Sequence, residues 1–185
     1  FTVSILRNST VYGFSPAFRD DLVVNNLVAC GLSTGVIKIK SDGTPWRPLI
    51  DVRDLSNIFV EFLKAESKKI NGEIINIGFN DSNFQIKGLV SIIQKQLPNC
   101  KIIFTNEHGT DSRSYKVNFS KLNKIFPKIE KKWDIKSSIA DLVENLNKYG
   151  YSKHNFLSGT YTRQTSLKKL LKNDKLTDKL FWKKV

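Results

Sequence analysis

The chain has 185 residues, of which 40% are hydrophobic and 11% aromatic, and its formal net charge is +13. This length and composition suit one folded domain and exclude an intrinsically disordered chain. The sequence contains no run of about 18 apolar residues, so no membrane span is predicted. The apolar N-terminal residues lack the basic region and cleavage site of a signal peptide. The chain contains no Met, which suggests a truncated product, although recombinant trimming would look the same.

The first part of the chain alternates strand and helix patterns. Thr2–Leu6 is short, apolar and β-branched, which predicts a buried strand. The polar residues after it mark the carboxyl end of that strand, where open α/β sheets bind ligands. Asp20 and Asp21 are expected to open a helix, because acidic residues suit its N-terminal dipole, and Asn26 interrupts the apolar face of this helix. Val36–Lys40 is the next predicted strand.

The rest of the chain continues this alternation. Asp54 is expected to cap a helix whose apolar residues follow at helical spacing. The remaining predicted elements are a turn at 71–72, a strand at 73–77, a helix over 86–97, a strand at 101–104, an extended piece at 115–118, a long helix over 135–146 and a weaker helix around 167–171. Together these patterns predict an α/β or α+β domain.

Isolated cysteines and histidines argue against a metal site. Cys30 and Cys100 have no partner at C-x-x-C spacing, which favours two reduced thiols in a cytoplasmic protein, and His108 and His154 are also isolated.

The positive charge comes mostly from Lys residues, which are spread along the chain and crowded after Lys121. The exposed aromatic residues that alternate with basic ones in proteins binding single-stranded nucleic acid are missing from this pattern. We therefore expect no metal, no nucleic acid and no membrane as partners.

Four segments, in order, resemble the extended short-chain dehydrogenase/reductase (SDR) family, in particular its NAD-dependent nucleotide-sugar epimerases and dehydratases. The segments are LRNSTVYG at 6–13, DLVVNNLV at 21–28, SDGTPWRPLIDVRDL at 41–55 and DSRSYKVNFSK at 111–121. The resemblance covers about residues 1–150. It implies an α/β fold made of the last strands of a Rossmann-type sheet plus a small α/β substrate-binding domain. Residues 151–185 would then be a C-terminal helical extension.

The same resemblance implies which residues bind the substrate. Arg47 and Arg113 would bind the phosphates of a nucleotide, a role for which the planar, always-charged guanidinium is well suited. Thr10, which stands where the family has Asn, and Asn26 would contact the diphosphate. The backbone around Lys40 would lie along the nucleobase.

The cofactor, NAD or alternatively NADP, would be contacted here by Asn8 and Ser9. It would be bound mainly by an N-terminal half that this chain lacks, because no Gly-rich dinucleotide-binding turn is present. The catalytic Tyr and Lys are expected upstream of Phe1. An additional Arg that the family often has would fall where Glu107 and His108 stand, a departure that bears on nucleotide binding.

Each assignment has a structural alternative. Arg47 could pack on the ring of Trp46, as cation–π pairs do. Arg113 could form a solvated ion pair with Asp111. Asn26 could make a hydrogen bond on its helix face without contacting any ligand. The roles of Ser9 and Thr10 are equally open at this point.

The implied function is an NAD-dependent epimerase/dehydratase that acts through a 4-keto-sugar intermediate, with this part binding the nucleotide diphosphate-sugar. The fragment alone is expected to be inactive. Tyr149 and Lys153 form a Tyr-x-x-x-Lys pattern, but they follow the last family segment and are not predicted to be catalytic. Two alternatives stay open: a reductase of the same family, and a stand-alone basic binding module. A cytoplasmic location is expected, and a homodimer of the full-length protein is compatible with the resemblance.

Overall fold

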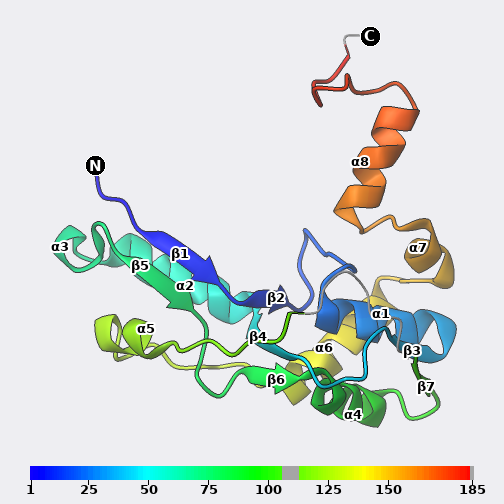
Figure 1. Cartoon of the computed structure of the whole chain (residues 1–185), viewed down its shortest axis with the longest axis horizontal. Helices are drawn as coiled ribbons and strands as arrows, with labels where there is room; N and C mark the ends of the chain where they lie inside the picture. Colours follow the sequence, from blue (N-terminus) through cyan, green and yellow to red (C-terminus); the bar gives the residue numbers. More distant parts are fainter. Residues whose placement is uncertain (106–112, 184–185) are drawn as a thin grey trace.

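The computed structural model describes residues 1–105 and 113–183 (Figure 1). The strands are β1 (Ile5–Asn8), β2 (Thr10–Tyr12), β3 (Val36–Ile39), β4 (Trp46–Asp51), β5 (Ile74–Ile77), β6 (Asn83–Gln85) and β7 (Lys101–Phe104). The helices are α1 (Val23–Thr34), α2 (Val52–Lys64), α3 (Ser67–Ile70), α4 (Ile86–Gln96), α5 (Ser120–Ile125), α6 (Ile135–Lys148), α7 (Lys153–Ser158) and α8 (Arg163–Lys172). The predicted α/β class is confirmed.

Within the described residues the strands pair in three small sheets. β1 and β5 are parallel, β2 is parallel to β4, which is antiparallel to β6, and β3 and β7 are parallel. Parallel neighbours require crossover connections, which here contain helices. The predominance of parallel pairs agrees with the predicted Rossmann-type origin of these strands.

The larger hydrophobic core, which we call the helical core, lies where α1, α4 and α6 pack together beside β3. Its buried residues recur at helical spacing on each helix: Val24, Leu27 and Val28 on α1, Leu89, Val90 and Ile93 on α4, and Ile139, Leu142 and Leu146 on α6. Full burial of one such side chain contributes about 1.5–3 kcal/mol. This core forms one side of the candidate site described below.

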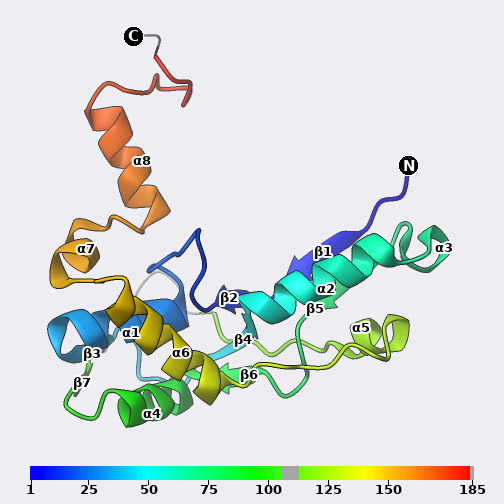
Figure 2. The same cartoon turned by 180° about the vertical axis from the view of Figure 1, so that it is seen from behind.

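The second core belongs to what we call the β1–β5 layer, made of β1, β5, α2 and α5. Figure 2 shows α2 lying along β1 and β5. Ile58 and Phe62 of α2 meet Ile75 and Ile77 of β5, and Leu122 of α5 completes the cluster. One face of α2 is thereby buried, whereas its other face is open within the described residues.

The prediction of a buried first strand was wrong in two respects. β1 begins at Ile5, not Thr2, and continues to Asn8. Ile5 is exposed, while Leu6 packs against the core of the β1–β5 layer. The reason is that, among the described residues, β1 has a paired neighbour on one edge only and a covering helix on one face.

The predicted start of the first helix was also wrong. α1 begins at Val23, so Asp20 and Asp21 lie before its first turn. Asp21 instead makes a two-pronged ion pair with Arg19, with 2.9 Å from Nε to Oδ1 and 2.8 Å from Nη2 to Oδ2. Asp20 is buried by the C-terminal residues. The contacts of these two carboxylates with other side chains, and not the dipole of α1, therefore determine where they lie.

The predicted cap of the second helix was displaced by three residues. Asp51 is the N-cap of α2, and its Oδ1 accepts a hydrogen bond of 2.8 Å from the amide of Arg53. The carboxylate of Asp54 accepts bonds from the amides of Lys132 and Trp133, both at 3.2 Å. Asp54 therefore joins two segments that are far apart in sequence.

Short elements were not predicted, and one predicted piece is irregular. β6, α3, α5 and α7 are three to six residues long. Residues 115–118 form no strand; the amide of Tyr115 donates to the carbonyl of Trp46, and the side chain of Asn83 binds the backbone of Val117. No helix in the part of the chain that the structure describes is long and apolar enough to cross a membrane. In Figure 1, α8 projects away from the helical core.

Candidate functional site

A cleft of about 870 Å³ lies beside the start of α1, between the end of β3 and the segment that begins at Arg113. It is lined by all of the residues predicted to bind substrate: Thr10, Asn26, Lys40, Arg47 and Arg113. A second cavity of about 530 Å³ lies between α2 and residues 125–132, and none of those predicted residues lines it. Residues from four separated segments thus meet in one place.

Arg47 is held at the cleft wall by its neighbours. It lies in β4 and is half-buried, and its Nη1 donates hydrogen bonds to the carbonyl of Trp46, at 2.9 Å, and to the carbonyl of Arg113. Its guanidinium also lies 5.5 Å from the ring centroid of Tyr115. The alternative named above was packing of Arg47 on the ring of Trp46; the cation over that ring is Lys116, whose Nζ lies 3.8 Å from its centroid.

The segment after Arg113 is fixed along β4 and β6 by backbone and side-chain hydrogen bonds. The amide of Trp46 donates to Ser114 Oγ at 3.1 Å, and the amide of Tyr115 donates to the Trp46 carbonyl at 3.3 Å. Asn83 binds both the amide and the carbonyl of Val117, at 2.9 and 3.1 Å. This clamp sets Arg113 beside Arg47.

The N-terminal end of α1 opens on the cleft. Its cap residue, Leu22, makes no side-chain cap hydrogen bond, and the first turn carries no acidic residue. Leu22 and Val23 both line the cleft. The amide end of a helix carries partial positive charge and suits an anion. Asn26 lies one turn further on, and its Nδ2 donates to the carbonyl of Asp20 at 2.7 Å.

The charged residues of the cleft are predominantly basic. Four cationic side chains line it, Lys38, Lys40, Arg47 and Arg113, against the two carboxylates of Asp21 and Asp42. The hydrogen bond from Arg19 lowers the pKa of Asp21, and the charge of Arg163 acts in the same direction. The Asp42 carboxylate accepts from the amide and hydroxyl of Thr44, at 3.0 and 2.7 Å. The charge of Asp21 is offset by Arg19, and the four cations outnumber the two carboxylates, so the cleft is suited to anions.

Asn8 and Ser9, predicted to contact the cofactor, lie outside this cleft at the carboxyl end of β1. Asn8 is exposed. Ser9 is buried, and its hydroxyl donates to the carbonyl of Ile77 at 2.8 Å. Gly78 follows Ile77 at the end of β5. A Cβ on Gly78 would lie only 2.5 Å from Ser9 Oγ, so this position requires glycine. Asn8 and Ser9 therefore lie at the carboxyl end of β1 and not in the cleft.

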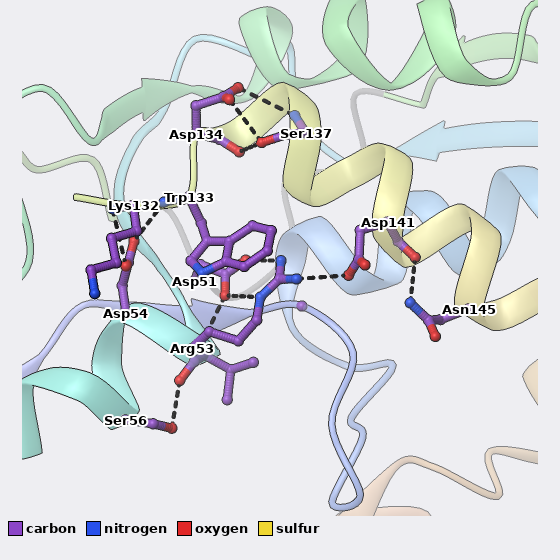
Figure 3. A network of polar contacts seen from close by, with 12 residues as sticks. Asp51, Arg53, Asp54, Ser56, Lys132, Trp133, Asp134, Ser137, Asp141 and Asn145 are labelled. Carbon is purple, nitrogen blue, oxygen red and sulfur yellow. Dashed lines mark hydrogen bonds and ion pairs between the residues drawn. The ribbon is translucent and has the colours of Figure 1, made fainter. Parts of the chain in front are cut away.

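A second polar cluster, at which no site was predicted from sequence, surrounds Arg53 (Figure 3). Its guanidinium pairs with Asp51 through contacts of 2.9 and 2.8 Å, pairs with Asp141 at 3.1 Å, and lies 3.4 Å from the ring centroid of Trp133. Burial raises the pKa of the neighbouring Asp54 carboxyl, the largest influence on it. This cluster joins α2 to α6, and none of its residues lines the cleft, so we regard it as structural.

Several other residues named from sequence do not contribute to the cleft. Tyr149 stacks on Phe14, 5.1 Å between ring centroids, and neither it nor Lys153 lines the cleft. Cys30 and Cys100 are free thiols. Glu107, His108 and Asp111 lie outside the described residues. Among residues 1–105 and 113–183, no three His, Cys, Asp or Glu side chains form a set that could hold a metal ion.

Comparisons with known proteins support the resemblance. The model of the NAD dependent epimerase/dehydratase family matches residues 1–78. In fold, the chain is similar to an NAD dependent NDP-hexosamine 5,6-dehydratase, TunA, involved in tunicamycin biosynthesis. The TM-score is 0.68 at 17% identity, covering 80% of this chain and 46% of that one.

Two further solved structures are similar. UDP-glucuronic acid 4-epimerase from Bacillus cereus, in complex with UDP-glucuronic acid and NAD, gives a TM-score of 0.68 at 23% identity, covering 79% of this chain and 45% of that one. dTDP-glucose 4,6-dehydratase from Bacillus anthracis, in complex with NAD, gives 0.61 at 21% identity, covering 77% and 44%. The chain thus spans somewhat less than half the length of these proteins.

The match over residues 1–78 contains β1 to β5 and α1 to α3, and the structural similarity extends over about four fifths of the chain. The resemblance to the extended SDR epimerases and dehydratases is therefore confirmed, in sequence over residues 1–78 and in fold over the larger part of the chain.

Proposed function

We propose that this chain forms the nucleotide-sugar-binding part of an NAD-dependent epimerase or dehydratase. The observation that carries the proposal is the convergence of Thr10, Asn26, Lys40, Arg47 and Arg113 on one basic cleft. These residues come from four segments that are far apart in the sequence. A shared cleft is the arrangement that binding of one ligand requires.

The diphosphate would bind between the two arginines and the start of α1. Arg47 and Arg113 lie on one wall, and Leu22 and Val23 mark the helix end on the cleft. Guanidinium groups offer planar, charged donors, and helix amides add donors and partial positive charge. Lys38 and Lys40 would add long-range attraction for a doubly charged ligand.

The sugar and the base would be contacted by the remaining lining residues. Thr10, the first residue of β2, lines the cleft, and its hydroxyl would offer one donor to the substrate. The backbone at Ile39 and Lys40 would lie along the base. Fixing the diphosphate in this way would hold the sugar at a defined distance from the reacting groups, which is how remote binding serves catalysis.

NAD would contribute hydride transfer when bound, and the residues present fit only a peripheral part of it. The Ser9 hydroxyl already donates its proton to Ile77, so only its oxygen can accept a bond from a ligand. Asn8 is exposed at the carboxyl end of β1 and could contact a cofactor there. The catalytic Tyr and Lys and the Gly-rich turn would come from residues upstream of Phe1.

The exposed apolar side chains of the β1–β5 layer are consistent with a separate part of the protein that binds the cofactor. Val3, Ile5 and Ile74 are exposed apolar side chains, and we propose that the cofactor-binding part covers them. Residues 1–150 would form the substrate-binding part and residues 151–185 an extension of it. The reaction would pass through a 4-keto sugar in a cytoplasmic enzyme, with epimerisation, dehydration and reduction as the candidate outcomes.

The test is calorimetric titration of the chain with UDP-glucose. Arg47→Ala is expected to raise the Kd about tenfold to a hundredfold, because it removes charge-assisted hydrogen bonds. Arg47→Lys should recover only part of the affinity, since an ammonium cannot make the bidentate contact. Arg7→Ala is the matched control, because Arg7 is exposed in β1 and does not line the cleft.

An unchanged Kd in a folded Arg47→Ala protein would count against the proposal. Binding of single-stranded DNA that exceeds binding of UDP-glucose and weakens steeply with salt would favour the stand-alone basic module instead.

A further inference from the structure

The segment from Gly13 to Leu22 separates the cleft from the C-terminal extension. Asp21 and Leu22, at its end, line the cleft. Asp20, the residue before them, is only 2% exposed, and its carboxylate is contacted by residues of the extension. One short stretch of chain therefore touches the candidate site and the extension together.

Two hydroxyl groups of the extension hold the Asp20 carboxylate. The Tyr151 hydroxyl donates to Oδ2 at 2.8 Å, and the Thr162 hydroxyl donates to Oδ1 at 2.7 Å. These residues are 131 and 142 positions away along the chain. A buried carboxylate is stable only when donors satisfy it, so Asp20 ties the segment to the extension at a defined point.

Ring contacts fix the same segment beside Asp20. Phe18 meets Tyr151 and Tyr161 edge to face, with ring centroids 6.0 and 5.7 Å apart. Tyr151 and Tyr161 also contact each other at 5.7 Å. Such arrangements are specific in geometry as well as apolar. The position of Asp20 thus depends on the extension through both polar and aromatic contacts.

The main chain of Asp20 carries this constraint to the cleft. Its carbonyl accepts a hydrogen bond of 2.7 Å from Nδ2 of Asn26, a residue that lines the cleft. That bond fixes which way the Asn26 amide is turned. It leaves Oδ1 and one amide proton of Asn26 for a ligand.

We propose that Tyr151 and Thr162 are positioning residues, which set the side-chain amide of Asn26 in the nucleotide-sugar cleft through Asp20. This inference rests on the proposed function for its consequence in binding. The extension then has a role in the site although neither Tyr151 nor Thr162 lines the cleft.

The link itself is tested without any ligand, by the NMR resonance of the Asn26 side-chain amide in the complete chain. Tyr151→Phe and Thr162→Val each remove one donor to Asp20, and both are expected to shift this resonance. Thr162→Ser keeps the hydroxyl and should leave it near its original position. Tyr161→Phe is the matched control. The Tyr161 ring belongs to the same aromatic cluster, but the hydrogen bonds to the Asp20 carboxylate come from Tyr151 and Thr162. A resonance unmoved by both donor variants would overturn the proposal.

The consequence for binding is tested by a double-mutant cycle with UDP-glucose. The pair Tyr151→Phe and Thr162→Val is expected to raise the Kd about threefold to tenfold in the presence of Asn26, and to have no further effect in Asn26→Ala. The same increase in both backgrounds would overturn the proposal. If the unmodified chain does not bind UDP-glucose, the proposed function fails, whereas the amide resonance still decides whether the extension positions Asn26.

Discussion

The helical core and the β1–β5 layer differ in how completely they are covered. In the helical core, α1, α4 and α6 bury one another's apolar faces, and Leu142 and Ile139 are fully inaccessible. In the β1–β5 layer, one face of α2 packs on the sheet, while Leu63 on its other side is 87% exposed. The helices of the helical core therefore cover one another's apolar faces, whereas α2 in the β1–β5 layer is covered on one face and leaves Leu63 in water.

The largest expected effect is loss of packing in the helical core. Leu142→Ala should lower the free energy of unfolding by about 2–5 kcal/mol, because the site is fully buried between helices and cannot collapse easily. Urea unfolding of the complete chain measures this. A loss under about 1 kcal/mol would mean that the helical core is not the main source of stability.

The next effect concerns the joint between the two regions. Arg53→Ala leaves the buried carboxylate of Asp51 without its cationic partner and removes the stacking on Trp133. A cost of about 1–3 kcal/mol in unfolding free energy is expected. Arg19→Ala is the matched control, because Arg19 makes the same two-pronged contact with Asp21 but both side chains are partly exposed. That control should cost less than about 1 kcal/mol, and equal losses would contradict a special role for Arg53.

Two carboxylates should give opposite pH dependence. Hydrogen bonds, first of all from the Ser137 hydroxyl, lower the pKa of Asp134, the cap of α6. Its contribution is therefore present above its usual pKa of 3.8 and lost as the pH falls through the lower folded value. Asp134→Ala should cost about 1 kcal/mol near neutral pH, and the difference from the unmodified chain should shrink in acid.

Burial raises the pKa of Asp54, so its contribution has the reverse sign. That contribution is present below the usual value of 3.8 and is lost as the pH rises through the higher folded value. Relative to Asp54→Asn, the unmodified chain should lose stability over this rise. Urea midpoints measured from pH 3 to 7 follow both carboxylates, and parallel curves for the two variants would contradict these assignments.

The smallest effect is expected on the open face of α2. Leu63→Ser should change the unfolding free energy of this chain by no more than about 0.5 kcal/mol, because the side chain is already in water. In a longer protein that includes residues upstream of Phe1, a larger cost would show that this face is covered there. A large cost in the present chain would instead contradict the comparison of the two regions.

Much of the candidate cleft could be predicted from sequence. The local sequence around Arg47 and Arg113 predicts phosphate binding, because guanidinium groups suit phosphates and the family resemblance is carried by short segments. Both residues line the cleft, and their role in binding stays a prediction. The partners of Arg47 could not be foreseen, since the Arg113 carbonyl and the Tyr115 ring are brought to it by a segment clamped by Asn83.

The sequence by itself determined the order of the main strands and helices, because apolar periodicity of 2 or 3.6 residues is a local property of the chain. It also determined which side-chain groups the cleft offers to a ligand, among them the guanidinium groups of Arg47 and Arg113. Only the tertiary structure decided the roles of the acidic residues: Asp20 satisfied by Tyr151 and Thr162, Asp51 as the helix cap, and Asp54 as a tie to residues 132–133. The physical reason is that a carboxylate accepts equally well from a nearby amide and from a distant donor, and burial selects between them.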